Sequence, residues 1–149
     1  MSYNRLRLGR YSEPGREYFI TFVTFNRTPA FDDLMKARVV IQQLYQLEKD
    51  GLLTPLAWVL MPNHIHILTT LGDGCLSDSI KQLKGRSARI INDHPEGRPQ
   101  PLWQSGFYDR ALRHEEDRLA IARYIVANPL RAGLVNRLGD YPHWDSVWL

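Results

Sequence analysis

Cysteine is almost absent from this chain of 149 residues, and long apolar runs are missing altogether. The single cysteine, Cys75, excludes an internal disulfide and a cysteine-rich zinc module, and it makes a reducing cytoplasm the expected compartment. No stretch approaches the ~20 apolar residues needed to cross a bilayer, so no membrane partner is expected. A glycine-rich P-loop is also missing, which argues against a nucleoside triphosphate site.

The excess of positive charge is small, with a formal net charge of +3 at pH 7. Such a balance permits nucleic-acid binding without demanding it. The basic residues are nevertheless clustered, in an N-terminal arm (1–16) and in one predicted helix. We predict that both clusters contact nucleic-acid phosphates, the alternative being that they are solvated surface. The clusters are Arg5, Arg7 and Arg10, and Lys81, Lys84, Arg86 and Arg89.

Apolar residues follow strand and helix periods in the order β-α-β-β-α-β, with one further helix towards the C-terminus. We expect strands at 17–25, 56–60, 64–71 and 106–112, and helices at 34–49, 77–92 and 114–127. Pro129 should end the last helix, because the residue before a proline avoids helical geometry. The order predicts one α+β domain (1–149) of the ferredoxin-like, or RRM-like, class, with an antiparallel sheet and an aperiodic tail at 130–149.

Two histidines, His64 and His66, open the predicted strand 64–71. Because side chains alternate across a strand, both imidazoles should share the face opposite to Ile65 and Ile67. Neutral imidazole is a common metal ligand, and two on a rigid strand make half of a divalent-cation site. The alternative is that the two rings face solvent or bond to a neighbour.

The helix expected at 114–127 carries a phenol, and an amide oxygen follows one helical turn later. Tyr124 and Asn128 are four residues apart and therefore share one face of a helix. Docked over the histidines, Asn128 can supply a third metal ligand while Tyr124 approaches the group that the metal polarises. This donor set leaves positions for phosphate oxygens and favours Mg²⁺ or Mn²⁺, although ligand type alone also admits Zn²⁺.

Four sequence runs occur in an order that resembles the REP-associated tyrosine transposases. These belong to the IS200-like, single-tyrosine HUH transposases, in which HUH denotes two histidines around a hydrophobic residue. The runs are MPNHIH at 61–66, LKGR at 83–86, LWQSGFYD at 102–109 and YIVANPLRAGLV at 124–135. The resemblance extends over about 18–135 and rests on all four runs in order.

The resemblance implies cleavage of single-stranded DNA near a hairpin, with a tyrosine joined to the 5′ phosphate and a free 3′-hydroxyl. At matching positions, Tyr124 would be the nucleophile, and His64, His66 and Asn128 would hold the divalent cation. Related mobile-element enzymes often carry glutamine at the position of Asn128, so this shorter side chain requires a helix nearer the sheet. The family also implies a monomer or homodimer that acts on hairpin DNA.

Two other functions fit the same residues. A protein of this fold could bind structured DNA or RNA without cutting it. A metal-dependent hydrolase would need a positioned general base to activate water, and the sequence offers no obvious one beside the histidines. Three other tyrosines compete for the nucleophile's role, but Tyr18, Tyr108 and Tyr141 are expected in packing, stacking or anchoring positions.

Overall fold

The computed structural model describes residues 12–93, 100–113 and 118–149. The predicted contacts of Arg5, Arg7 and Arg10 lie outside these residues, as does the beginning of the helix expected at 114–127. The strands are β1 (Glu17–Val23), β2 (Leu53–Met61), β3 (His64–Leu71), β4 (Tyr108–Ala111) and β5 (Trp144–Ser146). The α-helices are α2 (Leu34–Lys49), α3 (Leu76–Ile91), α4 (Arg118–Val126) and α5 (Asn128–Arg131), and short 3-10 turns lie at Phe25–Arg27, Ala30–Asp32 and Leu138–Asp140.

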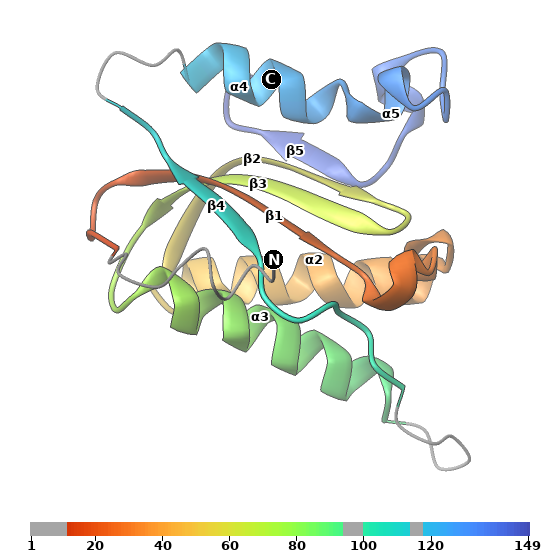
Figure 1. The fold of residues 1–149 in the computed structure, drawn as a ribbon. Coiled ribbons are helices and arrows are strands. Elements are labelled where there is room, and N and C mark those ends of the chain that lie inside the picture. The colour runs from red at the N-terminus through yellow and green to blue at the C-terminus, as the bar shows by residue number, and fades with distance from the viewer. Residues whose placement is uncertain (1–11, 94–99, 114–117) are drawn as a thin grey trace.

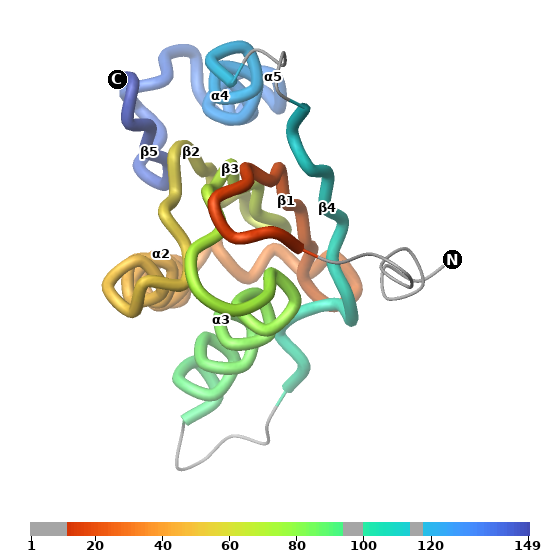
Figure 2. Tube along the Cα trace, turned by 90° about the vertical axis from the view of Figure 1, so that its left-hand side faces the viewer, coloured from red at the N-terminus to blue at the C-terminus, as the bar shows by residue number. Residues whose placement is uncertain are grey.

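The five strands form one sheet in the order β4-β1-β3-β2-β5, with antiparallel pairing throughout. The first four strands have the order of a ferredoxin-like fold, so the predicted α+β class is confirmed. Three layers are visible: α2 and α3 cover one face of the sheet, and α4 covers the other (Figures 1 and 2). The central strand, β3, is therefore covered on both faces.

The layer of α2 and α3 forms the larger core. The carboxylate of Asp33 accepts hydrogen bonds from the main-chain N–H groups of Met35 and Lys36, which starts α2 at its predicted residue. Apolar residues at helical spacing then face the sheet, and each buried side chain of this kind contributes about 1.5–3 kcal/mol. The buried set includes Val40, Leu44 and Leu47 of α2, Ile80 and Leu83 of α3, and Ile65 and Ile67 of β3.

A smaller core lies under α4, on the opposite face of the sheet. Ala122 and Ile125 of α4 belong to the same buried cluster as Val59 of β2 and Leu68 of β3. Since Ile65 and Ile67 point to the larger core, the alternation of β3 places His64 and His66 on the α4 side. The predicted face of the histidines is therefore confirmed.

The tail beyond 130 was expected to be aperiodic, but it adds the edge strand β5, paired with β2. Two hydrogen bonds with the main chain of Leu60 hold the tail in place: the Tyr141 hydroxyl donates to the carbonyl of Leu60, and the N–H of Leu60 donates to the carbonyl of His143. Tyr141 is thus an anchor, as expected. His143 is also largely buried, with only 9% of its surface exposed.

The end of α4 also differs from the expectation. Pro129 does not stop the helical path; it lies in the first turn of α5, whose N-cap is Ala127. A proline needs no N–H in a first turn, and its fixed φ suits that position. The helix is therefore interrupted at Ala127 and continues for one more turn as α5. No helix among the described residues is long and apolar enough to span a membrane.

Candidate active site

His64 and His66 lie at the start of β3, where the strand leaves its tight turn with β2. Their ring centroids are 4.9 Å apart, and the ring planes are nearly perpendicular at 76°. In the sheet register His66 faces Thr21 of β1, and His64 faces Val23. Both histidines are only partly exposed, so the pair forms a fixed cluster under α4.

Each imidazole is held at Nδ1 by a neighbouring oxygen. The Nδ1 of His64 lies 2.7 Å from the amide oxygen of Asn63, and the Nδ1 of His66 lies 2.7 Å from the hydroxyl of Thr21. An amide oxygen only accepts, so Asn63 places the proton of neutral His64 on Nδ1 and leaves Nε2 with its lone pair. Oxygen partners of this kind orient metal-binding histidines in proteins. No pattern in the sequence indicated the Thr21 partner.

Both imidazoles are neutral near pH 7. Burial lowers the pKa of His64, and the positive charge of Arg27 lowers it further. For His66, burial is again the main cause, and His64 and Arg131 add to it, so that its pKa falls to about 4. Neutral imidazole is the form that binds a metal ion.

His66 should therefore stay neutral in the metal-free protein when the pH falls below 6.5, its ordinary pKa. The unfolded chain takes up this proton near pH 6.5 and the folded chain only near pH 4, so folding stability should decrease as the pH falls through that window. An NMR titration of the imidazole carbon signals measures this directly. A His66 midpoint near 6.5 would contradict it.

Tyr124 extends from α4 beside this pair. Its side chain is 52% exposed. The ring of Phe19 connects the two groups: its centroid is 6.3 Å from that of Tyr124 and 5.7 Å from that of His66. The structure thus places the predicted nucleophile and the histidine pair around one aromatic side chain of β1.

The orientation of the Asn128 side chain depends on the proline that follows it. Pro129 has no N–H, so the carbonyl of Ile125 lacks its usual helical donor. The side-chain amide of Asn128 donates to that carbonyl at 3.2 Å, which leaves the amide oxygen available as a ligand. Asn128 opens α5, which contacts β2, the strand paired with β3. In the described part of the chain no three His, Cys, Asp or Glu residues cluster, so a third protein ligand would have to be a group such as this amide.

Two arginines that the sequence reasoning did not select also lie at this site. Arg131 of α5 stacks on Tyr124, seven residues earlier, a helical spacing that could have revealed it. Arg27, whose charge acts on His64, lies in the 3-10 turn after β1. Asn26 and Arg27 have φ values of 54° and 52°, a left-handed conformation that costs energy in residues other than glycine.

The other tyrosines are less suited to the nucleophile's role. Tyr18 is buried, and its hydroxyl accepts a hydrogen bond from the N–H of Glu13. Tyr141 is engaged with Leu60. Tyr108 is 44% exposed, but it lies on the edge strand β4 and no ring contact with either histidine joins it to the described site. Exposure together with the shared contact through Phe19 favours Tyr124.

The basic residues belong to α3, which lies on the opposite face of the sheet from α4, the helix that carries Tyr124 (Figure 1). Lys81 and Arg89 are exposed, and their contact with DNA stays a prediction. Arg86 pairs with Asp50 at 3.4 Å. The ammonium of Lys84 donates to the carbonyls of Gln104 and Gly106, each at 2.7 Å. Lys84 therefore has a structural role in the fold.

Lys84→Met should destabilise the protein by about 1.5–3 kcal/mol, because two carbonyls lose a charged donor while the apolar stem is kept. Urea unfolding measures this effect. Lys81→Met, an exposed change on the same helix, is the matched control and should have almost no effect. Equal stability of the two variants would show that the Lys84 hydrogen bonds contribute nothing.

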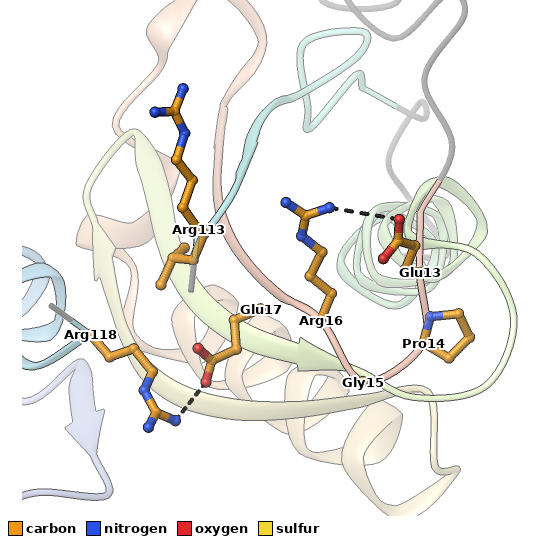
Figure 3. Close-up of a pocket in the computed structure, with 8 residues that line it drawn as sticks. Glu13, Pro14, Gly15, Arg16, Glu17, Arg113 and Arg118 are labelled. Carbon is orange, nitrogen blue, oxygen red and sulfur yellow. Dashed lines mark hydrogen bonds and ion pairs between the residues drawn. The ribbon is translucent and has the colours of Figure 1, made fainter. Parts of the chain in front are cut away.

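A pocket of about 580 Å³ lies away from these residues, at the beginning of β1 and the end of β4 (Figure 3). Its charged residues are partly paired with one another: Arg118 lies 2.9 Å from Glu17, and Arg16 lies 3.7 Å from Glu13. Neither histidine of the pair lines it, nor does Tyr124. The pocket is therefore separate from the candidate active site.

A ferredoxin-like sheet with a His-x-His pair on its central strand, and a tyrosine on the helix that covers it, defines the class of single-tyrosine HUH proteins. The family model described as "Transposase IS200 like" matches residues 14–128, which include all four candidate residues. The chain belongs to this family. The resemblance inferred from the sequence runs is thereby confirmed.

Known relatives agree with this placement. A REP-associated tyrosine transposase of Escherichia coli K12 is 30% identical over 88 residues, which are 58% of this chain and 50% of that protein. A Haemophilus influenzae Rd protein, provisionally given the same name, is 25% identical over 144 residues, covering 87% of this chain and 78% of the relative. A solved structure of a REP-associated tyrosine transposase bound to a REP hairpin superposes with a TM-score of 0.76 at 25% identity, over 91% of this chain and 79% of the other. The match to the E. coli protein thus spans about half of that relative's length.

Proposed function

We propose that the protein is a metal-dependent single-strand DNA endonuclease and strand transferase that acts at hairpin-forming repeats through a 5′-phosphotyrosine intermediate. The observation that carries the proposal is the grouping of exposed Tyr124 and the His64–His66 pair around Phe19. The hairpin substrate is supported by the related transposase structure, which is bound to a REP hairpin.

The residues fit a divalent cation. We assign Nε2 of His64, Nε2 of His66 and the amide oxygen of Asn128 as its ligands, and Mg²⁺ or Mn²⁺ as the ion, because the remaining positions would be taken by oxygen. When bound, such a cation polarises the phosphate and favours the ionised phenol beside it. Thr21 and Asn63 keep the imidazoles oriented, and burial keeps them neutral.

Tyr124 performs the covalent step. Its phenolic oxygen attacks phosphorus, a bond from this oxygen to phosphorus forms, and the bond from phosphorus to the 3′ oxygen breaks. The phenol proton passes to solvent, and the released 3′ oxygen takes up a proton from solvent. Because one phosphodiester replaces another, the energy of the bond is kept for rejoining and no nucleoside triphosphate is needed.

The test is a hairpin oligonucleotide made from inverted repeats that flank the gene, with single-stranded extensions and a label at either end. With Mn²⁺, the 3′-labelled strand should migrate with the protein on a denaturing gel, and the 5′-labelled strand should become a shorter fragment ending in a 3′-hydroxyl. Binding without either product would identify a silent DNA-binding protein. Cleavage without a covalent complex would instead indicate hydrolysis by activated water.

A further inference from the structure

The guanidinium of Arg131 holds Tyr124 in two ways. Its central carbon lies 4.0 Å from the centre of the Tyr124 ring, and Nη2 donates a 2.7 Å hydrogen bond to the main-chain oxygen of Tyr124. One side chain therefore contacts both the ring and the backbone of the proposed nucleophile. This matters because Tyr124 is half exposed and has no hydroxyl partner among the described residues to restrain it.

The break between α4 and α5 makes this arrangement possible. Pro129 interrupts the ladder of main-chain hydrogen bonds, and two side chains supply donors at the break: Asn128 to Ile125, and Arg131 to Tyr124. The same short segment thus directs the amide of Asn128 and covers the ring of Tyr124. The positions of the third proposed ligand and of the nucleophile are coupled through it.

Arg131 also brings positive charge to the site. Its side chain is exposed, and within the described ranges no carboxylate pairs with it. A guanidinium has five N–H donors in a planar fork that suits phosphate oxygens, and here one N–H is spent on a carbonyl. With its central carbon 4.0 Å from the centre of the Tyr124 ring, the guanidinium keeps its remaining donors close to the ring that bears the hydroxyl.

We propose that Arg131 positions Tyr124 and donates a hydrogen bond to a non-bridging oxygen of the phosphodiester that Tyr124 attacks. The second part rests on the function proposed above. As the tyrosine oxygen bonds to phosphorus and the 3′ oxygen departs, negative charge grows on the non-bridging oxygens, and a donor already in place stabilises it. Arg131 itself gains and loses no proton.

The test compares Arg131→Gln and Arg131→Lys with Arg123→Gln, a change at an exposed arginine of α4. Under single turnover on the hairpin, Arg131→Gln should lower the rate about 100-fold, the usual effect of removing one such donor, with a much smaller change in hairpin affinity. Arg131→Lys keeps the charge without the fork and should recover part of the rate. Arg123→Gln should match the wild type, and wild-type rates in Arg131→Gln would overturn the proposal.

A second measurement separates phosphate contact from mere structural support. Methylphosphonate linkages, which lack one charged oxygen, are placed one at a time along the single-stranded foot of the hairpin. At the contacted linkage, affinity should fall for the wild type and for Arg123→Gln by the same small factor that Arg131→Gln itself causes, and it should not fall further for Arg131→Gln, because that contact is already missing. Equal losses in all three proteins at every linkage would exclude the phosphate contact. This binding measurement shows whether Arg131 contacts the phosphate even if no covalent complex forms. The absence of a covalent complex would refute the proposed function separately.

The positioning of Tyr124 has its own readout. With ¹³C-labelled tyrosine, the ring signals of Tyr124 should move towards the values of a free side chain in Arg131→Gln and stay in place in Arg123→Gln. Thermal unfolding checks that both variants remain folded. Unchanged Tyr124 signals in Arg131→Gln would show that the stacking does not position the ring.

Discussion

Tyr124→Phe should form no covalent complex with DNA while binding the hairpin as tightly as the wild type. The substitution keeps the ring, its contact with Phe19 and its stacking with Arg131, and removes only the attacking oxygen. Loss of a covalent nucleophile lowers turnover by about 10⁴-fold or more in other enzymes. Denaturing gels with the end-labelled hairpin measure the complex, and a filter-binding titration measures affinity.

Tyr108→Phe is the control for this variant. Tyr108 is similarly exposed, at 44% against 52% for Tyr124, but it lies on β4 and has no ring contact with His66. It should form the covalent complex at the wild-type rate. If Tyr124→Phe still forms the complex and Tyr108→Phe does not, Tyr108 is the nucleophile and the proposed site is wrong.

The same variant tests whether two copies share a site. Tyr124→Phe and His66→Ala each lack one essential group. Activity in a mixture of the two would show that Tyr124 of one copy acts beside the histidines of another. An inactive mixture fits a site built within one chain, as the contacts through Phe19 suggest.

Local signals made much of the fold predictable. The regular apolar spacing located α2 at its observed residues, where Asp33 caps the N-terminus. Strand periodicity also predicted that His64 and His66 share a face, because this prediction needs only the alternation of side chains along β3. The strand β5 was missed because it has three residues, too few for a period, and its pairing with β2 bridges most of the chain.

The reactive residues of the site were predictable from the sequence, but the residues that orient them were not. Helical spacing joined Tyr124 to Asn128, but the bond between Thr21 and His66 depends on the register of two strands 45 residues apart. For Lys84, the local pattern indicated a function but not the structural contacts of the side chain. Its place in a basic helix suggested a DNA contact, and its carbonyl partners come from a loop some 20 residues later that no local pattern reveals.

His66→Ala should remove metal-dependent cleavage and weaken Mn²⁺ binding by more than about 100-fold. Losing a neighbour that merely orients a ligand already costs about 10–100-fold in other metal sites, and this substitution removes the ligand itself. Apart from His64, itself an assigned ligand, the only other described imidazole is that of His143, which belongs to the tail next to Tyr141. Calorimetry with Mn²⁺ measures the affinity, and circular dichroism checks that the fold is kept.

Thr21→Val tests the supporting hydroxyl separately from the metal ligand that His66→Ala removes. Valine keeps the shape of threonine but removes the oxygen 2.7 Å from Nδ1 of His66, so the imidazole remains and loses its orientation. We expect Mn²⁺ binding to weaken by about 10–100-fold, between the wild type and His66→Ala. That order is the signature of a ligand and its supporting hydroxyl, whereas a general loss of stability would not rank the variants in this way. Equal Mn²⁺ affinity in all three proteins would remove the metal from this face of the sheet and leave Tyr124 and Arg131 to act without it.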